Sequence, residues 1–168
     1  MTQEIYFAAG CFWGTEKLFQ SIQGVVQTQC GYANGKPEIN PDYQRVCQGD
    51  TDYRETVHVV YDPEQVSLPQ LLKAFFLVVD PTIENRQGND IGTQYQSGIY
   101  YTDAGSEALV KAYAQEEFSR WPRFCVELKP LSIFVPAEEY HQKYLDKNPT
   151  GYCHIPRVTF SVINEKIR

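Results

Sequence analysis

The sequence predicts an α+β fold, a ferredoxin-like two-layer α/β sandwich with a split βαβ core. Two observations favour this fold. Strand-like and helix-like segments follow one another in the order β-α-β, β-α-β, and the composition, with 42% hydrophobic residues, is that of a packed globular protein. A chain of 168 residues is long enough for one such domain. We expect a core over residues 1–146 and a C-terminal segment over residues 147–168.

The first βαβ unit occupies the N-terminal part of the chain. Residues 4–9 form a short apolar stretch that is typical of a strand. From Cys11 onward, apolar residues recur at near-helical spacing until Gly24, which is a suitable helix stop. Residues 25–32 are strand-like again. The segment ANGKPEINPD, with Asn-Gly and two prolines, indicates a loop that is long enough to favour a functional role.

The second unit follows this loop. Residues 54–61 alternate in a strand-like way, which places Glu55 on the same face as Val57, Val59 and Tyr61. Residues 68–79 carry a helical apolar stripe. This helix ends at Asp80-Pro81, because proline disfavours helical geometry at the residue before it. Another loop and a strand over residues 95–101 complete the unit.

Further elements extend this core. The sequence predicts a polar helix over residues 104–120, a strand over 125–129 and a short helix over 137–145. The stretch DKNPTGYCHIPR lacks periodicity, so we expect extra helices followed by a long irregular C-terminal segment.

Charge and hydropathy exclude several classes of partner. The net charge of -6 is spread along the chain without a basic run, which argues against nucleic acid and anionic membranes. No apolar run approaches the length of a membrane span, and residues 1–10 do not have the pattern of a secretion signal. We expect a cytoplasmic monomer with no bound metal or organic cofactor.

Five cysteines are scattered along the chain without a CxxC pair, which argues against a zinc site and against a framework of disulfides. Cys11 stands out, because Gly10 allows a strand to turn sharply into a helix and places the thiol at the first helical turn. The unpaired N–H groups there favour a thiolate, so we expect a lowered pKa and a nucleophilic sulfur. The alternative is an ordinary buried cysteine.

The motif GCFWG resembles the active-site motif of the peptide methionine sulfoxide reductases of the A type. The resemblance continues, in the family's order, through GYANG, NPDYQRVCQGDTDYRE, VVYDP, RQGNDIGTQYQSGIYY and HQKYLDKNPTGYC. It therefore covers nearly the whole chain, which would be a single catalytic domain. It implies an oxidoreductase of protein repair under oxidative stress that reduces methionine S-sulfoxide, free or in peptides and oxidised proteins, with thioredoxin, or dithiothreitol in vitro, as reductant.

The same resemblance assigns roles to two cysteines. Cys11 would attack the sulfoxide and become a sulfenic acid, and Cys153 would resolve it as a disulfide that thioredoxin exchanges. No cysteine follows Cys153, which favours a cycle with a single disulfide. Cys30 is the rival resolving residue, whereas Cys47 and Cys125 are interpreted as structural.

The resemblance also implies the substrate pocket. Phe12 and Trp13 would enclose the substrate's methyl group, and Glu55 would be the acid, with a pKa raised by desolvation. Three further polar side chains would contact the sulfoxide oxygen or complete its pocket: Tyr43, Tyr95 and Asp90.

One departure and two alternatives remain. Asp52-Tyr53-Arg54 stands where the family has Gly-His-x, which puts the loop geometry in doubt, although Arg54 should point to the face opposite Glu55. A Cys-His hydrolase or acyltransferase would need His58 or His141 as base for Cys11. A non-catalytic ferredoxin-like binding module would need none of these groups.

Overall fold

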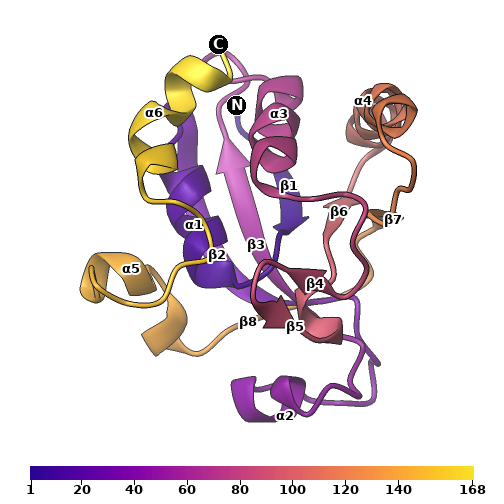
Figure 1. Cartoon of the computed structure of the whole chain (residues 1–168), viewed down its shortest axis with the longest axis vertical. Helices are drawn as coiled ribbons and strands as arrows, with labels where there is room; N and C mark the ends of the chain where they lie inside the picture. The colour runs from indigo at the N-terminus through magenta and orange to yellow at the C-terminus, as the bar shows by residue number, and fades with distance from the viewer.

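One sheet organises the molecule, which the computed structural model describes over residues 1–168 (Figure 1). Its strand order is β7-β6-β1-β3-β2-β8, and all neighbours are antiparallel except β6 and β7. The strands are β1 (Gln3–Ala8), β2 (Val25–Ala33), β3 (Arg54–Tyr61), β6 (Gly98–Tyr101), β7 (Glu127–Pro130) and β8 (Phe134–Pro136). The fold is therefore mixed α+β with a mostly antiparallel central sheet, as the sequence indicated at this level.

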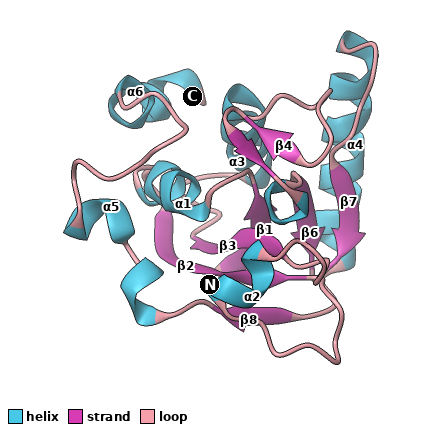
Figure 2. Ribbon diagram, turned by 60° about the horizontal axis from the view of Figure 1, so that its bottom comes forward, coloured by secondary structure: helices cyan, strands magenta, loops and turns pink.

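Six helices accompany the sheet (Figure 2). They are α1 (Phe12–Gln20), α2 (Tyr43–Cys47), α3 (Leu68–Val78), α4 (Ala104–Arg120), α5 (Tyr144–Lys147) and α6 (Val158–Lys166). Two 3-10 turns, η1 (Thr93–Tyr95) and η2 (Glu139–His141), and a small hairpin of β4 (Arg86–Gln87) and β5 (Asp90–Ile91) complete the chain. No helix has both the length and the apolar character needed to span a membrane.

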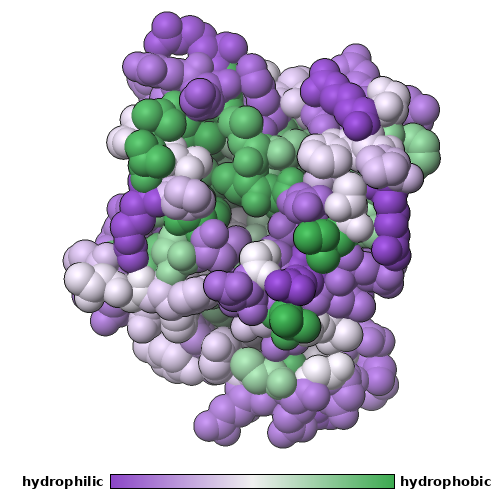
Figure 3. Space-filling view, viewed as in Figure 1, coloured by the Kyte–Doolittle hydropathy of each residue, from purple (hydrophilic) through white to green (hydrophobic).

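The main core lies between the sheet and its helices. Alternation along β1 sends Ile5 and Phe7 into a core of 29 buried residues, while Tyr6 and Ala8 join a cluster of four on the other face. Phe7 stacks on Phe19 of α1 with ring centroids 4.4 Å apart. On the face shown in Figure 3, most of the visible apolar surface lies between α6 and α3.

Several predicted elements are confirmed. The strand over residues 54–61 and the helix over 104–120 have the predicted bounds, and β1, β2 and α3 differ from the predicted ranges by one residue. The helix α1 ends at Gln20, before the predicted stop at Gly24. The helix α3 ends before Asp80-Pro81 as expected. Glu55, Val57, Val59 and Tyr61 share the buried face of β3.

Other predictions are wrong in detail. The strand predicted over residues 95–101 begins only at Gly98, after η1, and the helix predicted over 137–145 is divided because Lys143 has a left-handed φ of 51°. The C-terminal segment is not irregular throughout, since it ends in α6. The Asn164 side chain of α6 accepts from Gln23 N (2.8 Å) and donates to Ser21 O (3.0 Å), so contacts with the end of α1 stabilise this helix.

Candidate active site

A sharp turn between β1 and α1 positions Cys11. Gly10 has a φ of 85°, which L side chains rarely adopt, and Cys11 is the N-cap residue of α1. The Cys11 side chain is 7% exposed. The strand-turn-helix arrangement predicted around this thiol is therefore confirmed.

The lowered pKa that we expected for Cys11 is not found. Burial raises the pKa of the Cys11 thiol well above its usual value, and the nearby carboxylates of Glu55 and Asp90 add to this. The Trp13 backbone N–H at the start of the helix acts in the opposite direction but does not prevail. The protein therefore holds Cys11 as a thiol, because desolvation of the charged form outweighs the effect of the helix N-terminus.

Glu55 lies next to this thiol on β3, with 1% of its surface exposed. Its Oε1 accepts a hydrogen bond from Phe12 N at 3.1 Å, whereas its Oε2 is buried without a partner. Burial raises the pKa of Glu55 to about 8, with a smaller contribution from Asp90. Glu55 is thus a protonated acid at neutral pH with one oxygen free to donate, and the raised pKa expected from the sequence is found with the expected cause.

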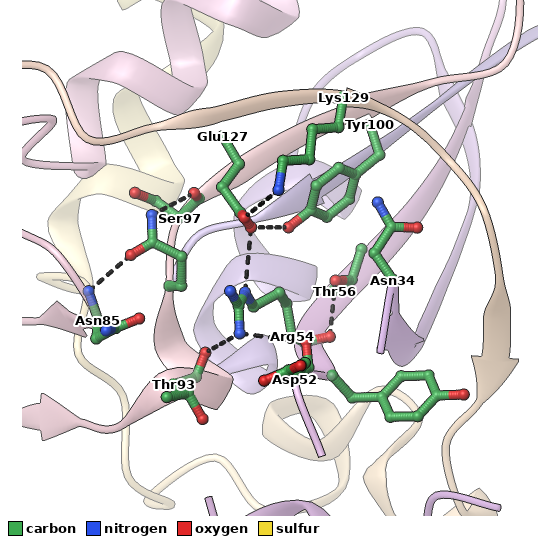
Figure 4. Close-up of polar contacts among 12 residues, drawn as sticks. Asn34, Asp52, Arg54, Thr56, Asn85, Thr93, Ser97, Tyr100, Glu127 and Lys129 are labelled. Atoms are coloured by element: carbon green, nitrogen blue, oxygen red, sulfur yellow. Dashed lines mark hydrogen bonds and ion pairs between the residues drawn. The ribbon is translucent and has the colours of Figure 1, made fainter. Parts of the chain in front are cut away.

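The Arg54 side chain lies among Glu127, Thr93 and Asp52 (Figure 4), as expected for a residue that alternates with Glu55 along β3. Its Nε donates to Glu127 Oε1 at 3.1 Å, and its Nη1 donates to Thr93 O at 3.0 Å. The guanidinium thus connects β3 to β7 and to η1, the turn that carries Tyr95. Because Arg54 has these partners, no cation neutralises the Glu55 carboxyl group from the neighbouring position.

Aromatic rings form one wall of the site. Phe12 is fully buried, and half-buried Trp13 stacks on Tyr144 with centroids 3.7 Å apart and an interplanar angle of 9°. Trp13 Nε1 donates to His141 Nδ1 at 2.9 Å. His141 is 1% exposed and packs on Phe12 and Tyr43. His141 and Tyr144 were missed as site residues, although both lie in the HQKYLDKNPTGYC motif.

Polar groups converge on the same place. Tyr43 and Tyr95 are half-buried, and burial first, then the charge of Glu55, raises the pKa of each phenol, so both remain hydrogen-bond donors. Asp90 Oδ2 is buried without a hydrogen-bond partner. The hydroxyl of Tyr152, another residue that we missed, lies against Asp90, and burial together with this carboxylate raises the pKa of Tyr152 to about 12.

Cys153 lies beside the first turn of α1. A Cβ on Gly14 would come within 3.1 Å of Cys153 Sγ, so the glycine leaves the space that this sulfur needs. The Cys153 thiol is half-buried and donates to Ile155 O at 3.2 Å. Cys153 is also among the neighbours that raise the pKa of Cys11, so the two cysteines that the resemblance paired lie near each other, and all five cysteines are free.

Cys30, the rival resolving residue, is enclosed. It has no exposed surface, and its thiol donates to Glu16 Oε1 at 3.2 Å. The other two cysteines differ from each other: Cys125 is half-buried and donates to Thr82 O, whereas Cys47 is exposed beside Tyr43. The exposure of Cys47 shows that this thiol is not part of the core.

The departure at Asp52-Tyr53 leaves the loop intact. Asp52 has a φ of 63°, the left-handed conformation that glycine favours and aspartate tolerates. Tyr53 is fully buried, and its ring occupies the space over Gly35, where a Cβ would lie only 2.1 Å from the ring. This contact between Tyr53 and Gly35 fixes the loop before β3. Glu55 therefore has its place on β3 although the Gly-His pair of the family is absent.

Neither His58 nor His141 is placed as a base for Cys11 in the way that a Cys-His hydrolase requires. His58 stacks on Tyr6 and pairs with Glu4 at 2.7 Å on the other face of the sheet, and the Nδ1 atom of His141 is occupied by Trp13. No cluster of three or more His, Cys, Asp or Glu side chains is placed to hold a metal ion.

Comparison with known proteins gives consistent matches. A family model described as "Peptide methionine sulfoxide reductase" matches residues 3–166. A peptide methionine sulfoxide reductase MsrA from Clostridium acetobutylicum is 49% identical over 156 residues, which are 92% of this chain and 96% of that protein.

Solved structures agree. The crystal structure of reduced Mxr1 from Saccharomyces cerevisiae superposes with a TM-score of 0.86 at 39% identity and covers 90% of this chain and 88% of its own. Mxr1 in complex with Trx2 gives a TM-score of 0.58 at 23% identity, over 85% of this chain and 84% of its own, a likeness that shows the fold alone.

Proposed function

This chain belongs to the peptide methionine sulfoxide reductase family, and we propose that it reduces methionine S-sulfoxide, free or in proteins, with Cys11 as nucleophile and Cys153 as resolving thiol. The observation that carries this proposal is the pairing at the start of α1. A buried thiol stands beside a carboxyl group that is protonated near neutral pH and has one oxygen without a partner.

The first step transfers the sulfoxide oxygen to Cys11. Glu55 gives its proton to the sulfoxide oxygen, and the ionised Glu55 then accepts the proton of the Cys11 thiol as the Cys11 sulfur attacks the substrate sulfur. The hydroxyl group passes from the substrate sulfur to the Cys11 sulfur, so that the S–O bond of the substrate and the transient bond between the two sulfurs both break, and the products are methionine and a Cys11 sulfenic acid. The two raised pKa values suit this exchange, because neither group has to be charged before substrate binds.

The surrounding residues hold the substrate for this step. Tyr43 and Tyr95 donate hydrogen bonds to the sulfoxide oxygen as its charge changes, and Asp90 completes the polar side of the pocket. Phe12 and Trp13 receive the methyl group, and the Trp13 ring is held for this purpose by Tyr144 and His141. Aromatic faces here exclude water from the reacting atoms.

The second step regenerates the enzyme. Cys153 attacks the sulfenic sulfur of Cys11, water leaves, and the resulting disulfide is reduced by thioredoxin through thiol exchange. The partner assignment is supported by the chemistry of a dithiol pair and by the yeast protein Mxr1, whose structure includes one in complex with Trx2. We assign no bound cofactor, because thiols supply both electrons.

The proposal also includes a ferredoxin-like core, a cytoplasmic setting and a monomeric state. The order β6-β1-β3-β2, with α1 and α3 as connections, supports a ferredoxin-like core within the larger sheet. Five free cysteines favour a reducing compartment such as the cytoplasm, where the chain acts as a monomer.

A stereochemically resolved assay tests the proposal. Reduced protein is incubated with the separate S and R epimers of a blocked methionine sulfoxide and dithiothreitol, and methionine is quantified by chromatography. We expect consumption of the S epimer alone, and no consumption by Cys11→Ser. Equal use of both epimers, or activity that survives Cys11→Ser, contradicts the assignment.

A further inference from the structure

His154 lies across the turn that carries Cys11. A Cβ on Gly10 would come within 3.1 Å of His154 Nε2, and a Cβ on Gly14 within 3.2 Å of His154 Nδ1, so the ring occupies the space left by the two glycines. Its Nε2 is 2.8 Å from Ala9 O. Because a carbonyl oxygen can only accept, Nε2 carries the hydrogen and Nδ1 has a free lone pair.

This lone pair and the resolving cysteine border the same space. A Cβ built on Gly14 would be 3.2 Å from His154 Nδ1 and 3.1 Å from Cys153 Sγ, so these two atoms lie no more than 6.3 Å apart over the first turn of α1. Nδ1 is buried and has no hydrogen-bond partner. Asp90 Oδ2, also buried and without a partner, lies 4.0 Å from Nδ1. A base and a carboxylate that can stabilise its protonated form thus adjoin a thiol.

We propose that His154 is the general base of the resolving step, an assignment that rests on the proposed function. Nδ1 takes the proton of the Cys153 thiol while the Cys153 sulfur bonds to the sulfenic sulfur of Cys11. The S–O bond of the sulfenic acid breaks, and the departing hydroxide receives the proton from His154 and leaves as water. The sum is one sulfenic acid and one thiol converted to one disulfide and one water, so no other reactant is needed.

The transfer needs a movement of the Cys153 side chain. At rest the Cys153 thiol donates to Ile155 O at 3.2 Å, so it must leave this carbonyl oxygen and turn toward Nδ1 across the space over Gly14. Asp90 then faces an imidazolium across 4.0 Å in a site from which water is largely excluded.

The charges around His154 suit a base that is neutral at rest. Burial lowers its pKa, and this outweighs the Ala9 carbonyl and Asp90, which raise it. The other ionisable groups at this point are Cys11 and Tyr152, both uncharged near pH 7 because burial raises their pKa values. Asp90 is therefore the principal charge that an imidazolium at position 154 would meet.

Single-turnover kinetics of the full-length enzyme test this role. His154→Gln keeps an N–H donor for Ala9 O but has no basic atom, and His58→Gln makes the same change on the other face of the sheet as a control. Reduced enzyme is mixed with a blocked methionine S-sulfoxide without reductant, then quenched for methionine and for free thiols. We expect unchanged methionine formation in both variants, but disulfide formation slowed on the order of 100-fold in His154→Gln alone.

A pH series separates a base from a structural residue. With His154, disulfide formation levels off once the imidazole is neutral, whereas in His154→Gln and His154→Asn it should rise about tenfold for each pH unit as hydroxide replaces the base. A wild-type disulfide rate in His154→Gln, or a slower rate with the wild-type pH profile, overturns the proposal. Failure of the wild type to release methionine would instead overturn the proposed function.

Discussion

Cys153 and Cys30 both lie against α1, yet their surroundings differ in kind. Cys153 is half-buried on an irregular segment, beside an imidazole without a partner at Nδ1, and donates only to Ile155 O. Cys30 is sealed in the sheet and donates to Glu16, whose oxygens also accept from Thr28 Oγ1 (2.8 Å) and Lys143 N (2.6 Å).

The difference shows what makes a thiol available for exchange. Burial and the charge of Glu16 raise the pKa of Cys30, and the strand that carries it is hydrogen-bonded on both sides. Attack on Cys11 from there would break a satisfied buried network, whereas attack from Cys153 breaks one bond to a carbonyl. The two thiols therefore differ in how firmly their surroundings hold them, and not in their sequence distance from Cys11.

Replacing Cys153 or Cys30 with serine should give the largest difference in turnover between two variants. Cys153→Ser is expected to release one equivalent of methionine and then stop with thioredoxin as reductant, because the sulfenic acid at Cys11 has no resolving thiol. Cys30→Ser should sustain turnover. Peptide mapping of the oxidised wild type should give a Cys11–Cys153 disulfide, and a Cys11–Cys30 disulfide would reverse the comparison.

Glu55→Gln should affect the step that precedes either thiol. The amide donates a hydrogen bond but does not give up its proton, so methionine formation in a single turnover should slow on the order of 100-fold. Since the acid must be protonated, the wild-type rate of this step should fall as the pH rises above about 8. A flat profile through this range contradicts the acid role.

Glu55 also makes stability depend on pH. Its pKa is raised in the folded state from 4.5 to about 8, so the native protein holds one more proton than the unfolded chain between these values. Stability relative to Glu55→Gln should therefore fall as pH rises through this window, by at most about 1.4 kcal/mol per pH unit. Urea denaturation of both proteins at pH 5 and pH 8 measures this difference.

Gly14→Ala tests the space around Cys153. The new methyl group would lie 3.1 Å from Cys153 Sγ and 3.2 Å from His154 Nδ1, so the C-terminal segment must shift by a few tenths of an ångström. We expect disulfide formation to slow about tenfold while methionine formation stays near the wild-type rate. Gly105→Ala is the control, because Gly105 also lies in a helix, and its Cβ would meet only the Asp103 Oδ1 atom, at 3.3 Å, far along the chain from the two cysteines.

The Cys30 region should influence stability more than chemistry. Glu16→Gln replaces one acceptor oxygen with an NH₂ group that faces donors, which leaves a buried donor without a partner. The variant should lose about 1–3 kcal/mol of unfolding free energy and keep the wild-type rate of disulfide formation. Thr28→Val, which removes only one donor to Glu16, should lose less. A slower resolving step in Glu16→Gln would assign Cys30 a share in the chemistry.

Much of the fold could be predicted because local patterns and tertiary structure agree there. Alternation placed Glu55 on the buried face of β3, and Asp80-Pro81 ended α3 where proline geometry requires. The elements that were missed are short or depend on distant contacts. Asn164 ties α6 to the end of α1, and the left-handed Lys143 divides a predicted helix because its N–H bonds to Glu16, 127 residues away.

For the site, the sequence by itself determined which residues we propose to carry chemistry. The turn Gly10-Cys11 singled out one thiol, and the resemblance that begins with GCFWG added Glu55, Cys153 and the aromatic residues. Only the tertiary structure decided their protonation and their neighbours. Cys11 is a buried thiol instead of a thiolate, Glu55 has a free oxygen, and His154 and Cys153 border the same space over Gly14. Motifs fix residue type and local geometry, but desolvation and orphaned polar atoms arise from segments that are far apart in the chain.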